Sequence, residues 1–136
     1  MNFGKLATDP NALHLVCPYP AASLWPNARS HWSRKARSAR QQRAAVRFIA
    51  SLSDRRPSKP FPRATVLAEF FCAGRGPDPD NAVAALKSTL DGLQDGHVLA
   101  NDRELVLLPV RIVPRSQWPE HVVAPQVVLH LLGESK

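Results

Sequence analysis

Apolar residues along the chain gather into four short runs and two periodic stretches, one long and one shorter. The four runs predict β-strands, at Leu13–Cys17, Ala64–Cys72, Leu105–Val113 and Gln126–Leu132. The second run is apolar on both faces except at Glu69, so we expect a central strand. Pro109 indicates that the third run is an edge or bulged strand, because proline cannot donate a ladder hydrogen bond. His130, inside the fourth run, is expected to be a strand histidine with its hydrogen bonds satisfied.

The two periodic stretches have the spacing of amphipathic helices. The longer runs from His31 to Leu52, with Ser30 placed as its N-cap. Its apolar stripe consists of Trp32, Ala36, Ala39, Val46, Ile49 and Ala50. The shorter helix is expected to open at Asp78-Pro79, an N-cap followed by proline in the first turn. Its predicted buried face consists of Val83, Leu86, Leu90 and Leu93.

These elements follow one another in the order β-α-β-α-β-β, which predicts an α+β fold of mixed α/β type. We expect a small mixed sheet of about four strands with two main helices, assembled as a dimer. Residues 13–136 are expected to form one domain, since a chain of 136 residues is large enough for one core. Residues 1–12 are expected to be a flexible N-terminal tail, because Asp9-Pro10-Asn11 has turn chemistry.

Basic and acidic residues are segregated along the chain, which adds an expectation about binding partners to the expected fold. The net charge is +7 and the sequence pI about 10.3, which favours an anionic partner. Residues 29–63 contain eleven Lys and Arg against the single acid Asp54, a net charge of +10. Residues 78–104 contain six acids against Lys87 and Arg103, a net charge of −4. One segment is therefore suited to a polyanion and the other to a metal ion.

Several classes of protein are disfavoured by what the sequence contains. Cys17 and Cys72 both lie in predicted strands without a paired-cysteine zinc pattern, which indicates buried free thiols in a reducing compartment. No apolar run has membrane-spanning length and no secretory segment is recognisable, so we expect a cytoplasmic protein without a membrane partner. A glycine-rich loop followed by Lys-Ser/Thr is missing, so no nucleotide cofactor is expected.

The acidic segment has the residue types of a metal-dependent hydrolase. Asp78 and Asp80 are two residues apart and point the same way in an extended stretch, and Asp102 is the best placed third acid. Mg²⁺ takes oxygen ligands, commonly one or two carboxylates with water and substrate phosphate. Lys87 shares a predicted helix face with Asp80 and Asp91, where its charge would offset the charge that develops on a reacting phosphate. Asp91 is a secondary site residue, and a helix cap is the alternative role of the aspartates.

The arginines of the long helix have two interpretations. Arg43 lies within the apolar stripe. It either extends along the helix edge to solvent or pairs with a buried acid, or it points at the acidic site or a phosphate. The others form either a solvated face or a phosphate-binding face, and their number without compensating acids favours phosphate. The residues expected to bind nucleic acid are Asn27, Arg29, Arg34, Lys35, Arg37, Arg40, Arg43, Arg47, Arg75 and Asn81. The loop at Ser53–Pro62 is expected to lie beside the nucleic acid.

The acidic segment resembles the RusA-type Holliday junction resolvases, which are small, often phage-borne endodeoxyribonucleases. The matching residues are Asp78-x-Asp80-Asn81, Leu86-Lys87, Leu90-Asp91-x-Leu93 and Asn101-Asp102, with Pro26-Asn27-x-Arg29-x-His31-Trp32 upstream. The resemblance implies a bacterial protein, with a phage or prophage as a further source, that is a homodimer and depends on Mg²⁺, with Mn²⁺ able to substitute. It implies symmetric nicks in a four-way DNA junction during recombination and repair. By position, Asp78, Asp80 and Asp102 match the catalytic, metal-binding aspartates and Lys87 the helix lysine.

Two features depart from the family pattern. The helix lysine follows the second aspartate one helical turn later than in many members, with Ala82–Ala84 as the inserted turn. Asn101 stands where an aspartate is usual, and it offers only a neutral ligand. Two alternatives stay open: a nuclease acting on other branched or flapped DNA, and a non-catalytic DNA-binding dimer. For the dimer, apolar surface is expected on the helix stripe and on Leu105–Val113.

Overall fold

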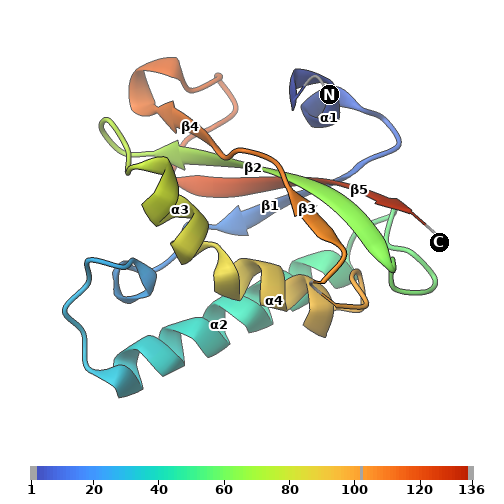
Figure 1. The fold of residues 1–136 in the computed structure, drawn as a ribbon. Coiled ribbons are helices and arrows are strands. Elements are labelled where there is room, and N and C mark those ends of the chain that lie inside the picture. The colour runs from blue at the N-terminus through green and yellow to red at the C-terminus, as the bar shows by residue number, and fades with distance from the viewer. Residues whose placement is uncertain (1–2, 102, 135–136) are drawn as a thin grey trace.

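A mixed β-sheet with helices on both of its faces forms the structure, a computed structural model that describes residues 3–101 and 103–134 (Figure 1). In chain order the elements are α1 (Phe3–Thr8), β1 (Leu13–Pro18), the 3₁₀ turn η1 (Ala22–Leu24), α2 (Trp32–Ser51), β2 (Arg63–Cys72), α3 (Pro79–Ala85), α4 (Lys87–Asp95), β3 (Leu105–Leu107), β4 (Arg111–Pro114), the 3₁₀ turn η2 (Arg115–Gln117) and β5 (Gln126–Glu134). The predicted α+β class is confirmed. None of the described helices has the length and apolarity needed to cross a lipid bilayer.

Strand β2 is the centre of the sheet, as its two-sided apolar sequence predicts. It pairs antiparallel with β5 along one edge, and β1 continues the sheet antiparallel to β5. Along its other edge β2 pairs in parallel with β3 and then with β4. The sheet therefore has five strands where about four were expected, because the run at Leu105–Val113 is two strands rather than one. The interruption falls at Pro109, which has no N–H to donate to β2.

The main core lies between the sheet and helices α2, α3 and α4, which cover one face (Figure 1). Alternate β2 residues point into it, and α2 contributes Val46 and Ala50 from its second half. A Cβ atom at Gly92 of α4 would lie 2.6 Å from the Val46 Cβ, so glycine permits the close approach of α4 to α2. Cys17 and Cys72 are free and buried in strands, as predicted.

Two predicted helix faces need correction. Trp32 is 75% exposed, because it lies in the first turn of α2, whereas the buried residues of this helix begin at Gln42. Val83 is 43% exposed, and the small side chains of Ala82 and Ala85 occupy the core position instead. The helix after Asp78 is also divided at Leu86 into α3 and α4.

The first residues of the chain are ordered against the sheet rather than forming the expected tail. Residues 3–8 form α1, whose Leu6 is buried with Leu67 and Leu108 on the face opposite α2. The turn after α1 is held by Asn11, whose backbone N–H donates to the Asp9 carboxylate at 2.8 Å. Phe3, Leu6 and Ala7 are the apolar residues of this six-residue segment, too few to reveal helical periodicity.

A row of polar side chains crosses the same face of the sheet. Arg111 contacts the Glu69 carboxylate at 3.0 Å, and the other Glu69 oxygen lies 2.5 Å from Nε2 of His130. The Nδ1 atoms of His130 and His14 are 2.7 Å apart, and His14 Nε2 lies 2.8 Å from the Asp9 carbonyl oxygen. His130 is therefore a satisfied strand histidine, as predicted.

The hydrogen-bond geometry of this row limits the roles of its ring nitrogens. The Asp9 carbonyl can only accept, so the facing His14 Nε2 donates to it. The Nδ1 atoms of His14 and His130 face each other, so one of them donates and the other accepts. The row is therefore hydrogen-bonded along its whole length.

The contribution of Glu69 to the free energy of unfolding should be lost at acid pH. The hydrogen bond from His130 holds the pKa of Glu69 below its ordinary value of 4.5, helped by the charges of His130 and Arg111, although burial opposes this shift. Its contribution to the free energy of unfolding is therefore fully present above the ordinary pKa and is lost as pH falls through the lower folded-state value. We expect Glu69→Gln to cost about 1–3 kcal/mol near pH 6.5, with the difference from wild type shrinking below pH 4.5.

Urea unfolding measured between pH 3 and pH 7 tests this expectation. The matched control is Glu104→Gln, because Glu104 is exposed and lies 3.8 Å from Arg63 in a loose surface pair. Parallel stability curves for wild type and Glu69→Gln across the whole range would contradict it.

Candidate active site

The turn between β2 and α3 holds Asp78 and Asp80 at one end of the sheet. After Cys72 the chain turns through Gly74 (φ 66°) and Gly76 (φ 87°), conformations that favour glycine. A Cβ atom at Gly76 would lie 2.6 Å from Cγ2 of Ile112, so glycine also permits the close approach of the turn to β4. The sequence signal Asp78-Pro79 therefore corresponds to the real start of α3, with proline at its first position.

Both aspartate side chains of this turn are exposed and available to a ligand. Asp78 occupies the N-cap position, but its side chain makes no capping hydrogen bond. Asp80 lies in the first turn of α3. Within the described residues, neither carboxylate takes part in a hydrogen bond or an ion pair. The capping role considered for Asp78 is therefore not what its side chain does in this structure.

The other described acids of the segment have cations beside them. Asp95 accepts two hydrogen bonds from Arg43, at 2.8 and 2.9 Å. These bonds hold the pKa of the Asp95 carboxyl below its ordinary value. Asp91 lies 4.0 Å from the Lys87 ammonium, and Glu104 lies 3.8 Å from Arg63. The described acids of this segment are thus divided into those with a cation within 4.0 Å and the open pair Asp78 and Asp80.

The predicted third aspartate, Asp102, lies outside the described residues. Its neighbours Asn101 and Arg103 are described, and the Arg103 N–H donates to the Asn101 side chain at 2.9 Å. Strand β3 follows this turn and starts opposite Ala64, whereas Asp78 follows the other end of β2. At about 3.3 Å per residue Ala64 and Cys72, near the two ends of β2, are about 26 Å apart. Among the described residues, no group of three or more His, Cys, Asp or Glu is placed to hold a metal ion.

Lys87 begins α4 directly after the break at Leu86. Its side chain is 78% exposed, and its ammonium lies beside the Asp91 carboxylate. Both residues line a hollow of about 520 Å³ between α2 and α4 that Trp32 also lines. The structure therefore joins Lys87 with the secondary site residue Asp91, whereas Asp80 does not line that hollow.

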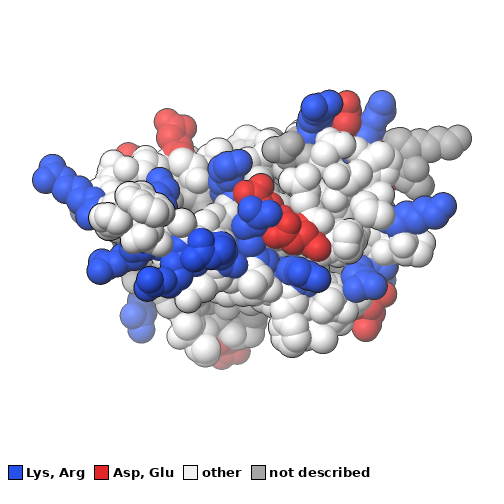
Figure 2. Space-filling model, turned by 90° about the horizontal axis from the view of Figure 1, so that it is seen from below, with Lys and Arg blue, Asp and Glu red and all other residues white. Residues whose placement is uncertain are grey.

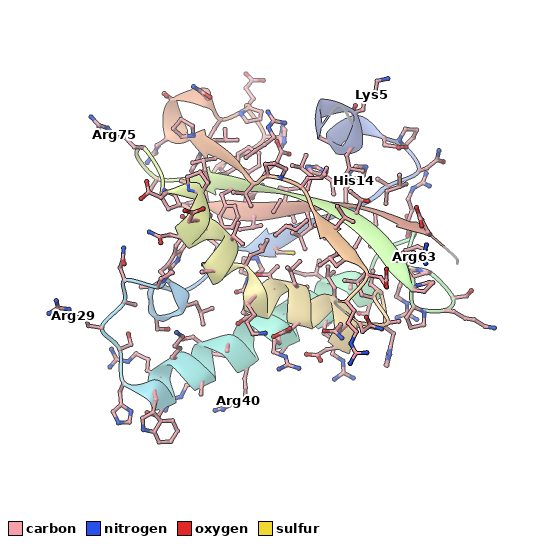
Figure 3. The ribbon with its side chains drawn as sticks, in the orientation of Figure 1. Lys5, His14, Arg29, Arg40, Arg63 and Arg75 are labelled. Atoms are coloured by element: carbon pink, nitrogen blue, oxygen red, sulfur yellow. The ribbon has the colours of Figure 1, made fainter. Side chains whose placement is uncertain are left out.

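The basic residues predicted to bind nucleic acid occupy two places. Helix α2 carries six exposed cations, Arg34, Lys35, Arg37, Arg40, Arg43 and Arg47, and Figure 2 shows blue side chains spread over this underside. Arg40 points away from the sheet below α2, whereas Arg29 and Arg75 extend from two loops on either side of the start of α3 (Figure 3). Asn27 is exposed in the loop with Arg29, and Asn81 is half-buried in α3.

Arg43 pairs with an acid, which was one of its two predicted roles. Its partner Asp95 is partly exposed rather than buried. Arg40, Arg43 and Arg47 nevertheless line one hollow of about 760 Å³ on the outer side of α2. Phe48, which is 64% exposed, lines it too. The N-cap of α2 is His31 rather than Ser30, since the His31 ring accepts a hydrogen bond from the Ser33 N–H at 3.2 Å.

Two aromatic residues near the open aspartates were not among the predicted site residues. Tyr19 and Trp25 line a hollow of about 590 Å³ together with Gly76 and Pro77, which directly precede Asp78. Arg115 was also missed and lines a further hollow with Arg75. Their sequence signal is weak, because isolated aromatic residues between prolines are typical of ordinary loops as well.

The chain matches no model of a known protein family. It is similar to an uncharacterized protein of Xylella fastidiosa (strain Temecula1), with 32% identity over 99 residues. This match covers 71% of the present chain and 64% of the relative, so the chain spans less than two thirds of that protein. The resemblance to the RusA-type family therefore rests on the motif residues themselves.

We expect the face of α2 that points away from the sheet to bind DNA phosphates through its arginine side chains. Changing Arg37, Arg40 and Arg47 together to Ala should weaken duplex binding and make it less dependent on salt, by about 0.9 in the log–log slope for each phosphate that the variant no longer neutralises. Titrations at several salt concentrations measure both quantities. A pair of single variants provides the matched control: Arg40→Ala should weaken binding, whereas Lys5→Ala should not. Lys5 extends from α1 on the opposite side of the sheet (Figure 3). Unchanged affinity and slope in the triple variant would mean that α2 faces elsewhere.

Proposed function

We propose that this chain is a Mg²⁺-dependent endodeoxyribonuclease of the RusA type that nicks four-way DNA junctions. The observation that carries the proposal is the pair Asp78 and Asp80, exposed and without partners among the described residues, in a segment whose other described acids stand beside cations. An unpaired carboxylate pair in a protein of net charge +7 is expected to serve a cationic ligand.

The donor set fits a hard divalent cation. Two carboxylates on one turn are a usual protein contribution to Mg²⁺, with water and phosphate oxygens as the remaining ligands. A bound Mg²⁺, or Mn²⁺ in its place, would lower the pKa of a water and offset charge on a phosphodiester. Asp102 as a third ligand stays a prediction from the sequence.

The surrounding residues supply the DNA-binding part of the proposal. Arg75 lies in the same turn as Asp78, and Arg29 extends from the loop before α2 (Figure 3), so both are available to contact phosphates of a bound DNA strand. The arginines of α2 offer a further cationic surface for a second arm of a branched substrate. Lys87 is only loosely paired with Asp91 at 4.0 Å, so its ammonium is free to turn towards a phosphate.

A non-catalytic DNA-binding protein is the second candidate. It is favoured by the lack, among the described residues, of a third acid or histidine beside Asp78 and Asp80. Nicking assays on four-way junction, flap and linear duplex, with and without Mg²⁺, separate the two candidates and also the substrates. Junction binding without nicking in any metal would favour the second candidate.

Replacing either aspartate should separate cutting from binding. Asp78→Asn and Asp80→Asn should each lower junction nicking by more than about 100-fold, an effect typical of losing one charge-positioning group at a reaction centre. Junction affinity should stay the same or rise, because repulsion between carboxylate and phosphate is relieved. The matched control is Glu120→Gln, which makes the same change of charge at an exposed acid between η2 and β5. Normal nicking by both site variants would remove the basis of the proposal.

The proposed reaction also requires a homodimer. A four-way junction has near two-fold symmetry, and one chain carries one Asp78–Asp80 turn, so paired nicks need two copies. Light scattering at micromolar concentration should give twice the chain mass of 15.0 kDa. Trp32→Lys and Val106→Lys test the two apolar surfaces available for the interface, since these side chains are 75% and 56% exposed. The control is Val123→Lys, and a monomer that makes paired nicks in one binding event would refute the requirement.

A further inference from the structure

An aromatic hollow lies directly beside the aspartate turn. One wall is the segment after β1, with Tyr19, Pro20, Ala22 and Trp25, and the other is the turn at Ala73, Gly76 and Pro77. Its volume is about 590 Å³, and none of the described residues that line it is charged. Pro77 directly precedes Asp78, so the hollow adjoins the segment that carries the open carboxylates.

The two rings of this hollow are held rigidly from behind. Tyr19 and Trp25 stack with their centroids 5.5 Å apart, and both rings meet Phe70 of the core edge-on, at 6.2 and 6.0 Å. The Trp25 indole N–H donates to the Pro20 carbonyl at 3.1 Å, and the Tyr19 hydroxyl lies 3.7 Å from the Cys72 sulfur. Both residues remain partly exposed, so the aromatic surface is fixed before any ligand arrives.

A second hollow lies on the other part of the same turn and has the opposite character. Gly74 and Arg75 line it together with Pro114, Arg115 and Ser116, in a volume of about 430 Å³. The Arg115 guanidinium lies 5.7 Å from the centre of the Trp118 ring, and the Arg115 backbone N–H donates to the Gly74 carbonyl. The lining residues include two guanidinium groups and no acid.

We infer that the aromatic hollow binds one unpaired base of the DNA substrate. The base stacks beside Tyr19 and Trp25, and Arg75 and Arg115 of the second hollow contact backbone phosphates of the same strand. Base–aromatic stacking together with a cationic groove is the chemistry that holds single-stranded nucleic acid. The Tyr19 hydroxyl and the Trp25 N–H are already engaged inside the protein, so the stacking surface takes any base.

This inference rests on the proposed function and gives it a source of selectivity. A base costs least to remove from the stack where it is already unpaired or strained, which is the case at a branch point. The aromatic hollow would therefore hold branched DNA beside Asp78 and Asp80 more tightly than intact duplex. A proline-rich peptide is the other ligand for such an aromatic surface, but two neighbouring arginines favour a polyanion.

Filling the aromatic hollow tests the inference without disturbing the core. Ala22 and Ala73 are exposed lining residues, so Ala22→Trp and Ala73→Trp each place an indole where the base would stack. The matched control is Ala124→Trp, at an exposed alanine before β5. Binding is measured with EDTA present, on a four-way junction that carries 2-aminopurine at the branch point and on the same junction with an abasic site there. Thermal unfolding of each variant confirms that it is folded.

Wild type and Ala124→Trp should change the 2-aminopurine fluorescence and bind the abasic junction about 10-fold more weakly than the intact one. Ala22→Trp and Ala73→Trp should lose the fluorescence change and bind intact and abasic junctions alike, while their binding to linear duplex stays unchanged. Arg75→Ala, compared with Lys5→Ala at an exposed cation of α1 on the other side of the sheet, should weaken junction binding without changing the response to the abasic site.

The outcomes separate this inference from the proposed function. If wild type and both filled variants show the same fluorescence change and the same loss of affinity for the abasic junction, the inference is overturned. Normal nicking by all three proteins would still leave the nuclease proposal standing. A response that is lost in the filled variants supports the inference even if no DNA is nicked, and then the nuclease proposal fails. Binding of a proline-rich peptide in the hollow together with failure to bind the junction would overturn both.

Discussion

The other features of the structure depend on strand β2, which is paired along both of its edges and packed against a core on both of its faces. Its start faces β3 and its middle and end face β4, while β5 covers its whole opposite edge. Residues on its two faces belong to different clusters, with Phe70 in the core under the helices and Leu67 in the core under α1. The end of β2 fixes where the turn with Asp78 and Asp80 must emerge, and Phe70 holds the two rings beside that turn.

Elements with a long or strong apolar signal could be predicted from the sequence, and the rest depended on contacts between distant segments. Strand β2 and helix α2 were predicted almost to the residue, because many positions repeat the same pattern. The exposure of Trp32 could not be predicted, since periodicity gives the face of a helix but not how far the sheet extends beneath it. Helix α1 was missed because six residues contain too few apolar positions to define a period.

The candidate site was predictable in composition but not in arrangement. The sequence contains six acids between Asp78 and Glu104, yet it does not indicate which of them is already neutralised. Arg43 is 52 positions from Asp95, so this pair exists only because α2 and α4 pack against each other at Gly92. The direction of β3 could not be predicted either. Because β3 pairs in parallel with β2, it starts beside the first residues of β2, whereas Asp78 follows the last.

The burial of both cysteines has a practical consequence for chemistry on this protein. Burial raises the pKa of Cys17 to about 12, and it raises that of Cys72 as well. Thiolate is the reactive form, so at neutral pH maleimides, iodoacetamides and mild oxidants should leave both native residues unmodified while the chain is folded. A cysteine introduced on the exposed surface could then carry a fluorophore or a crosslinker alone, with the native thiols kept in place.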